Sequence, residues 1–435
     1  MRFHLILLGL LALGAVRAEE RVPTRRPLQA PKAQLLIEQL GSRDYKEREK
    51  AGKELAAEGE AALPFLKAAL LTTEGPEVQR RLEVLIGTLN SEVAFRPSSV
   101  SIDCKNGSAR ATVKSICKQA GYTFQDGGQT DKKLTLKLSN VPFWEAARAI
   151  SVATGLAMTA TDDDQKTVSV YSDESISPHT HVNGPFRFTA TNINGSRSIQ
   201  LSNIPKVGRP PNQDYMNMSV TIQAEPKTVL VGVGNTRVLK AVDDKGSSLI
   251  GDDETEPGER RTGPIFVPIG YRSSTQSCNM GFNRGSREAT AIREFRAKVA
   301  VAVLIEERPE FVVESILDAK KKKFSGLNLD LEVVDATEAL GVATVKVKLS
   351  QREVNPNDRD WYSAVQQRLV MLDDKGGKMI GSLTEQNQNG AAMTMIISFS
   401  PSPGKKPGKP SKLILNEWVT ESREIEFKFK DIPLP

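Results

Sequence analysis

The chain has 435 residues, of which 39% are hydrophobic and 26% are charged, and its formal net charge is +6. Its 59 basic residues are interspersed with 53 acidic ones, whereas a nucleic-acid-binding protein gathers lysine and arginine on one face. We therefore expect no nucleic-acid binding. The densest basic run, Lys320–Lys323, lies between strand patterns and is interpreted as a solvated loop.

The first 18 residues have the three regions of a secretory signal peptide. Arg2 supplies the positive charge, Phe3–Val16 is the apolar core, and Ala18 provides the small residue at the cleavage site. This pattern predicts export to the periplasm or the extracellular space, with cleavage after Ala18. No later stretch approaches the length of about 18 apolar residues that a membrane span needs, so we expect no transmembrane segment in the mature chain.

The mature chain is long enough for about three domains, and its patterns predict a multidomain α+β protein. From the N-terminus, the expected parts are a helical segment over 32–90, a mixed βαββαββ domain over 97–172, and two β-sandwich-like repeats over 184–306 and 310–435.

The helical segment consists of four short amphipathic patterns with tight connections. Tyr45–Ala57 is charged, Ala61–Leu71 is more apolar, and Pro76 begins the last helix. The stretches Gly41–Glu49 and Gly75–Leu82 look like HEAT-type helix pairs, which predicts a fragment of an α-solenoid. A plain four-helix bundle is the alternative.

Residues 97–172 follow the order strand, helix, strand, strand, helix, strand, strand. Alternation of apolar and polar residues at Val100–Cys104 and at Leu134–Leu138 is typical of half-buried strands. Ser108 precedes a run with apolar or small residues at spacings of three and four, and Gly121 can close that helix.

A motif runs through the second half of this stretch. Asn140-Val141-Pro142 is followed by Glu145-Ala146 at the start of a helix, and then by Thr154-Gly155-Leu156 before a hairpin. This order resembles the short N-terminal domain shared by secretins and TonB-dependent receptors. The resemblance implies a periplasmic domain that contacts other proteins. The alternative interpretation is a generic α+β domain that has the same periodicity.

The helices of this domain have small residues on their buried faces, which leaves little room for a ligand cavity. We therefore expect it to bind an extended protein segment at a strand edge. The last strand, Lys166–Tyr171, is short and polar on its outer face. The candidate partner-binding residues on it are Thr167, Val168, Ser169 and Val170.

Beyond Tyr171 the sequence is rich in short alternating strands with turn residues between them, which is typical of β-sandwiches. An internal repeat supports two of them. Leu239–Gly251 aligns with Leu369–Gly381 with seven identities in 13 positions, and each copy contains Asp-Asp-Lys-Gly. The glycine of each copy can supply the positive φ of a hairpin turn.

Three cysteines, Cys104, Cys117 and Cys278, lie in a chain expected in an oxidising compartment. Cys104 ends a strand and Cys117 lies on the following helix, and both point by periodicity to the same core. Two interpretations are open: Cys104 and Cys117 form a disulfide, or both are buried thiols.

Few residues carry catalytic or metal-binding signals. The only histidines after the signal peptide, His179 and His181, have no cysteine nearby to complete a zinc site. No phosphate-binding glycine motif is present, so we expect no cofactor. Acidic groups at Asp162–Asp164, Asp243-Asp244, Asp252–Glu254 and Asp373-Asp374 could offer oxygens to calcium, but turn chemistry explains most of them.

These observations favour an exported, soluble, non-enzymatic protein that works in protein interaction and assembly, with envelope proteins as partners. One alternative is an accessory subunit that contacts an outer-membrane secretion channel or receptor. Another is a polysaccharide-binding or polysaccharide-cleaving protein that uses the sandwiches.

Overall fold

The structure is a computed structural model. It describes residues 29–128, 130–161, 166–172, 177–199, 212–250, 267, 270–286, 288–326, 329–352, 364–402 and 408–435. The signal peptide and the acidic groups at Asp162–Asp164 and Asp252–Glu254 lie outside these residues. The chain is of mixed α+β class, as predicted, and divides into two compact units, residues 1–86 and 87–435.

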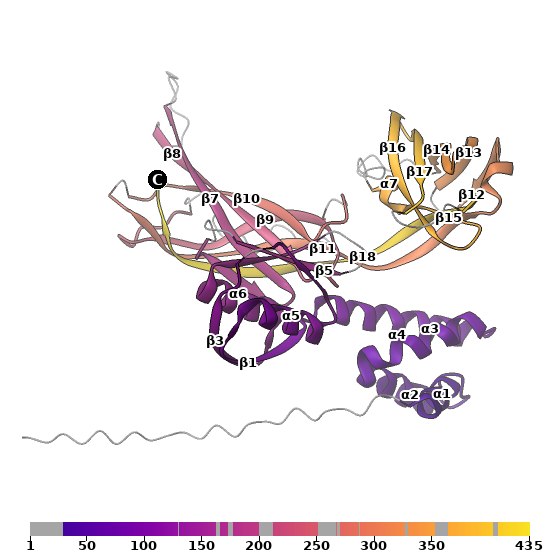
Figure 1. The fold of residues 1–435 in the computed structure, drawn as a ribbon, viewed down its shortest axis with the longest axis horizontal. Coiled ribbons are helices and arrows are strands. Elements are labelled where there is room, and N and C mark those ends of the chain that lie inside the picture. The colour runs from indigo at the N-terminus through magenta and orange to yellow at the C-terminus, as the bar shows by residue number, and fades with distance from the viewer. Residues whose placement is uncertain are drawn as a thin grey trace, which may run out of the picture. The chain divides into compact units, whose positions relative to one another are not determined.

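The N-terminal unit is helical (Figure 1). Its elements are α1 (Ala30–Gln39), α2 (Tyr45–Glu58), the 3-10 helix η1 (Gly59–Ala62), α3 (Leu63–Thr72) and the first part of α4 (Pro76–Phe95). Asp44 caps α2 by accepting from the Lys46 N–H, and Gly59 ends it with a φ of +66°. The core of the unit is built from Leu36, Leu40, Leu55, Leu66 and Leu82, which are all buried.

The C-terminal unit begins with a part that we name the α/β module, residues 99–172. Its elements are β1 (Ser99–Ser108), α5 (Ala109–Ala120), β2 (Thr123–Asp126), β3 (Lys133–Pro142), α6 (Phe143–Thr154), β4 (Leu156–Ala160) and β5 (Thr167–Ser172). β1 and β3 form a two-stranded antiparallel sheet, and β5 lies between β2 and β4 in a second sheet. Figure 1 shows α5 and α6 between these two sheets.

Local signals place both helices of the α/β module. The Ser108 hydroxyl accepts from the Ala111 N–H at the start of α5. Gly121 and Gly155 end α5 and α6 in the left-handed conformation, with φ of +75° and +69°. The helices bury one face each against the sheets, so that Val113, Ile116 and Ile150 share one core.

Two β-rich parts follow. The first β module contains β6 (Thr180–Asn183), β7 (Phe186–Ile199), β8 (Asn212–Ala224), β9 (Leu230–Asp243), β10 (Thr275–Asn283), the beginning of β11 (Ala291–Val313) and the end of β18 (Pro410–Pro433). The second β module contains the end of β11 and η2 (Ile316–Asp318), β12 (Lys322–Ser325), β13 (Leu329–Ala339), β14 (Val342–Gln351), α7 (Val365–Arg368), β15 (Leu369–Asp373), β16 (Lys378–Asn389), β17 (Ala392–Ser400) and the beginning of β18 (Pro410–Pro433).

The two β modules pair their strands in the same order. In the first, β6, β7, β8 and β10 are neighbours in one sheet, and β9 pairs with β11. In the second, β12, β13, β14 and β17 follow the same order, and β15 pairs with β18.

The repeated Asp-Asp-Lys-Gly turns also have the same hydrogen bonds. The first aspartate, Asp243 or Asp373, accepts through Oδ1 from the amides two and four residues on. Its own N–H donates to the carbonyl four residues on, at 3.0 and 2.9 Å. Gly246 and Gly376 have φ of +89° and +76°, so each glycine supplies the positive φ that the turn requires.

The last strands of the β modules differ from the expected layout. β11 and β18 pair from Ala291 and Pro433 at one end to Val313 and Leu413 at the other. The boundary expected between the repeats, residues 306–310, therefore falls inside β11. The expected second repeat, 310–435, is also not one separate body, because residues of β18 complete the core of the first.

Each of the two long strands, β11 and β18, contributes residues to the cores of both β modules. Phe427 and Phe429 of β18 lie in the core of the first β module, whereas Phe311 and Val313 of β11 lie in the core of the second. Alternation in the sequence marks one face of a strand as buried, but it does not tell which core the strand joins. Because β11 and β18 run through both modules, the strands that lead into the two repeated turns, β9 and β15, belong to one nine-stranded sheet.

Candidate functional site

The strand edge predicted from the sequence is wrong. Thr167, Val168, Ser169 and Val170 lie in β5, which pairs in parallel with β2 on one side and antiparallel with β4 on the other. Thr167, Val168 and Val170 are buried, and the Ser169 hydroxyl donates to Gln125 Oε1 at 2.8 Å. The error arose because the parallel pairing of β5 with the short, distant β2 leaves no mark on the alternation of β5 itself.

All three cysteines are free in the structure, which holds no bond between Cys104 and Cys117. The Cys104 Sγ contacts the Leu134 carbonyl oxygen at 3.3 Å. Cys117 and Cys278 are buried, and burial raises the pKa of each thiol to about 12. At neutral pH these two thiols are therefore protonated and unreactive.

The metal-binding candidates do not converge. Within the described residues, no group of three histidine, cysteine or acidic side chains could hold a metal ion. His179 Nδ1 lies 3.1 Å from the Lys430 carbonyl oxygen. The oxygens of Asp243 and Asp373 accept from backbone amides of their turns, which is the turn chemistry that the sequence indicates.

A buried carboxylate joins the α/β module to the first β module. Glu225, directly after β8, is fully buried. Its two carboxylate oxygens accept from the Ser98 N–H at 3.0 and 3.1 Å, and Oε2 also accepts from the Tyr122 hydroxyl at 2.6 Å. The Thr228 hydroxyl, three residues on, donates to the Ala94 carbonyl oxygen of α4 at 2.7 Å. We call this set, Glu225 with Ser98, Tyr122 and Thr228, the carboxylate clamp.

Burial dominates the electrostatics of the carboxylate clamp. It raises the pKa of Glu225 above its ordinary value, although the hydrogen bonds from Tyr122 and Ser98 act in the opposite direction. Burial, together with the neighbouring carboxylate, also raises the pKa of Tyr122. The phenol therefore keeps its proton and remains a donor to Glu225.

A second set of contacts lies beside the clamp and joins β7 to α6 and β4. The Arg187 guanidinium carbon lies 4.4 Å from the centre of the Trp144 ring, and Nη2 donates to the Met158 carbonyl oxygen at 2.7 Å. Arg187 also donates to the Gln223 side chain, which itself donates to the Thr159 hydroxyl. Burial lowers the pKa of Arg187 to about 10, so the group is still a cation at neutral pH. We call this set the arginine–tryptophan contact.

Sequence reasoning missed both sets. Arg187 and Gln223 alternate with the buried residues of β7 and β8, and alternation assigns such outward residues to solvent. That outward face packs against the α/β module instead. The one usable signal for these contacts was the position of Glu225 and Arg187 next to long apolar patterns. A charged residue in such a place needs a partner if it is buried.

The pH dependence of the clamp follows from the raised pKa of Glu225. A carboxyl group whose pKa is raised in the folded state contributes most stability at a pH below its ordinary pKa, which is 4.5 for a glutamate. It loses that contribution as the pH rises through the folded-state pKa. We expect hydrogen exchange of β1 and β8 amides, corrected for the intrinsic effect of pH, to show a more stable junction at pH 5 than at pH 8.

The Glu225→Gln variant is the control for this dependence. Glu310, whose pKa burial also raises, and His181, whose pKa burial lowers, titrate in both proteins. The difference between wild type and variant therefore isolates Glu225. A variant with the same pH dependence as wild type would show that the carboxylate does not control the junction.

A buried ion pair of the second β module lies on the long strands that the two modules share. Arg368 of α7 donates through Nη2 to Glu310 Oε2 at 3.0 Å and through Nε to the Asn416 carbonyl oxygen at 2.6 Å. The side chains of this ion pair are only 14% and 11% exposed. Burial lowers the pKa of Arg368 and raises that of Glu310, so desolvation opposes their mutual attraction and each partner depends on the other.

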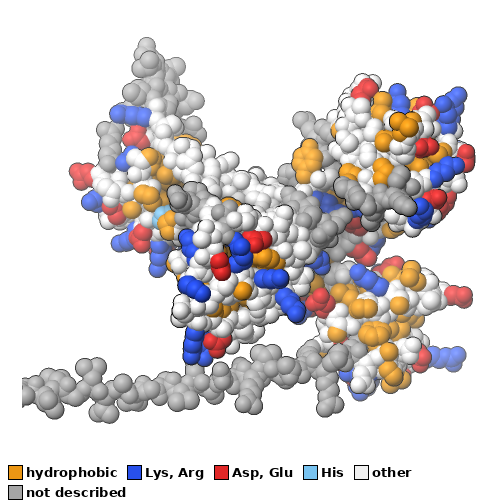
Figure 2. All heavy atoms as spheres, viewed as in Figure 1, with side chains coloured by type: hydrophobic (Ala, Val, Ile, Leu, Met, Phe, Trp, Pro, Cys, Tyr) orange, Lys and Arg blue, Asp and Glu red, His pale blue; other side chains and the backbone are white. Residues whose placement is uncertain are grey.

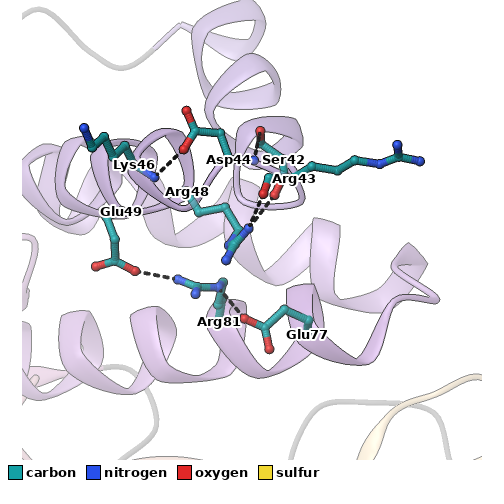
Figure 3. Close-up of polar contacts among 8 residues, drawn as sticks. All are labelled: Ser42, Arg43, Asp44, Lys46, Arg48, Glu49, Glu77 and Arg81. Atoms are coloured by element: carbon teal, nitrogen blue, oxygen red, sulfur yellow. Dashed lines mark hydrogen bonds and ion pairs between the residues drawn. The ribbon is translucent and has the colours of Figure 1, made fainter.

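The N-terminal unit has its own polar contacts, between α2 and α4 (Figure 3). Arg81 lies between Glu49 of α2 and Glu77 of its own helix, at 2.9 and 2.8 Å, and these hydrogen bonds raise its pKa. Beside α1 and α2 is an open hollow of about 630 Å³, whose lining includes Leu35 and Lys50. Figure 2 shows hydrophobic side chains between charged ones on the visible face of this unit.

The two-stranded sheet of the α/β module has one blocked edge and one open edge. The Gln119 side chain accepts from the Ser101 N–H and donates to the Ser101 carbonyl oxygen, both at 2.9 Å, and so occupies the edge of β1. Among the described residues, β3 pairs with β1 alone. Its exposed residues include Lys133 and Lys137. The second edge of β3 is therefore a place where a further strand could pair.

No family model matches the chain, and no curated protein matches its sequence. Among solved structures, the chain is similar to a conserved domain protein from Bacillus anthracis at 8% identity, over 57% of this chain and 89% of that chain, with a TM-score of 0.16. At that TM-score the likeness carries no argument about fold or function. In the part of the chain that the structure describes, no helix is long and apolar enough to cross a membrane.

Proposed function

We propose that this protein is an exported, non-enzymatic protein that binds other proteins of the cell envelope through its α/β module. The observation that carries the proposal is the one-sided attachment of that module. The carboxylate clamp and the arginine–tryptophan contact hold it through Tyr122, Trp144 and β4, whereas β1 and β3 lie on the other side of its helices (Figure 1). Fixing a module rigidly by one side reduces the entropy cost of binding a partner on the other.

Three finer assignments accompany this proposal. Residues 97–172 are proposed as a domain like the short N-terminal domain of secretins and TonB-dependent receptors, on the motif from Asn140 to Leu156. Residues 32–90 are proposed as a HEAT-like solenoid fragment. The β modules are proposed as duplicated β-sandwiches, because their strand order and their repeated turns agree.

The binding surface that we propose is the open edge of β3. Strand addition uses main-chain hydrogen bonds for affinity and neighbouring side chains for specificity. Lys133 and Lys137 lie on the exposed face of β3, so an extended segment with acidic side chains complements it best. This proposal replaces the edge on β5.

The test is quantitative affinity capture from envelope extracts with the full mature chain. The double variant Lys133→Glu and Lys137→Glu should retain at least tenfold less of the captured partner. The matched control, Lys322→Glu and Lys323→Glu on β12, makes the same charge change on another exposed strand and should retain the wild-type amount. Equal retention by both variants would refute β3 as the surface, and a wild-type chain that retains no protein would refute the binding function.

A narrower proposal names the partner as an outer-membrane secretion channel or receptor, with this chain as its soluble accessory subunit. It is supported by the motif resemblance alone. Identifying the captured protein by mass spectrometry decides it, because a partner of any other class would contradict it.

Export makes its own prediction. The charge of Arg2, the apolar run Phe3–Val16 and the small residue Ala18 fit a cleaved signal peptide. N-terminal sequencing of protein taken from the envelope or the medium should therefore begin at Glu19. Protein that retains Met1 and remains in the cytosol would contradict the proposed compartment.

A further inference from the structure

The hairpin between β13 and β14 has an unusual residue at its tip. The two turn residues are Leu340 and Gly341, with φ of +54° and +78°. A two-residue turn with positive φ at both positions favours asparagine, aspartate or glycine. Leucine is disfavoured there because its Cβ crowds the backbone in the left-handed region.

The Leu340 side chain has no packing that compensates for this conformation. The Leu340 side chain is 101% exposed, which makes it the most exposed of the large hydrophobic side chains among the described residues. The neighbouring hairpin of the same module, between β16 and β17, supplies its positive φ with Gly390. The fold therefore does not require leucine at the tip, since a better turn residue would fit.

A second exposed apolar side chain lies at the same end of the sheet. Ile380 of β16 is 51% exposed, and its register partner is Ser400 of β17. One row further in, Phe399 of β17 faces Ala343 of β14, just beyond the turn. Ile380 is thus two strand spacings from the start of β14, or about 10 Å.

We propose that Leu340, with Ile380 as a second contact, inserts into an apolar pocket on a protein partner. This inference rests on the proposed binding function and adds a second contact surface to it. The Glu338 carboxylate lies at the base of the tip, where Oε1 accepts from the Gly341 N–H at 2.8 Å, so a pocket with a basic rim complements it. A single leucine buries too little surface to hold a bilayer, and an acidic neighbour repels anionic lipid headgroups.

The first test is the thermal stability of the full chain carrying Leu340→Asn. Asparagine suits the turn, so the melting transition of the second β module should rise by about 2–4 °C. A transition that falls instead would show that Leu340 has a structural role, and would overturn the inference.

The second test measures binding. A photoreactive amino acid at position 340 should form a discrete adduct with one envelope protein, and the same probe at the exposed position Thr337 should give much less of it. With that partner purified, Leu340→Asn should weaken the Kd at least tenfold. The control Val312→Thr changes another exposed apolar residue of the same module, 44% exposed on β11, and should leave the Kd unchanged.

The remaining outcomes separate the alternatives. Flotation of the wild-type chain with vesicles of phosphatidylethanolamine and phosphatidylglycerol, lost in Leu340→Asn, would assign the tip to a bilayer and overturn the inference. An oligomer seen in sedimentation that Leu340→Asn dissociates would assign the tip to a second copy of the chain and would also overturn the inference.

If the partner binds Leu340→Asn as tightly as wild type, the tip inference fails and the binding function stands. If the wild-type chain binds no envelope protein, the binding function itself fails.

Discussion

Replacing Trp144 with alanine is expected to lower the free energy of unfolding of the α/β module by about 3–5 kcal/mol. Trp144 is fully buried in the core of that module and stacks edge-on against Phe143. Within the described residues its indole nitrogen has no hydrogen-bond partner, so packing and the contact with Arg187 account for its contribution. The substitution also leaves the buried Arg187 cation without its aromatic face.

Hydrogen exchange detected by mass spectrometry, read on peptides from α6 and β4, measures this loss locally in a multidomain chain. The control is Val152→Ala on the same helix. Val152 is 77% exposed, so its truncation should change stability by no more than about 0.5 kcal/mol. A Trp144→Ala protein as stable as the control would show that the module does not depend on this contact.

The second large effect is expected for Arg368→Ala. Removing the arginine leaves the Glu310 carboxylate of β11 without its cation, which costs about 3 kcal/mol for a pair this well buried. We expect the two β modules to unfold at a lower urea concentration, and hydrogen exchange to increase first in the central residues of β11 and β18.

Two further variants make this prediction specific. Arg308→Ala breaks a pair with Glu306 whose side chains are 45% and 21% exposed, and should cost at most about 1 kcal/mol. Replacing both Arg368 and Glu310 with methionine and leucine removes the uncompensated charge, so it should restore most of the stability. A double variant as unstable as Arg368→Ala would show that the loss comes from packing and not from charge.

Local signals in the sequence were sufficient for the elements of the α/β module. Ser108 and Gly121 delimit α5 by capping, and the alternation around Leu136 gives β3 its buried face. These signals act within a few residues, so they survive in one sequence without knowledge of the rest of the chain.

Pairing over long distances could not be predicted from the same signals. β5 alternates like an edge strand, yet it is central because β2 pairs with it, Thr123 with Thr167, across 44 residues of chain. β18 reads as one regular strand, and nothing in its alternation indicates that Leu415 and Phe427 belong to different cores.

The candidate site was missed for a related reason. Glu225 meets Tyr122 and Ser98 across 103 and 127 residues of chain, and only the folded structure brings them together. Periodicity assigns Arg187 to solvent, although its side chain covers Trp144. A charged residue on the polar face of a strand therefore indicates either solvent or another module, and the sequence does not distinguish the two.

The most direct test of the proposed binding function is hydrogen exchange of the full mature chain, alone and saturated with its captured partner. We expect the partner to slow exchange in β3 (Lys133–Pro142), because main-chain amides of its open edge become paired. We expect little change in β4 and β5, which are already paired or covered. Slowed exchange confined to other parts of the chain, with β3 unchanged, would contradict the claim that the α/β module is the binding module.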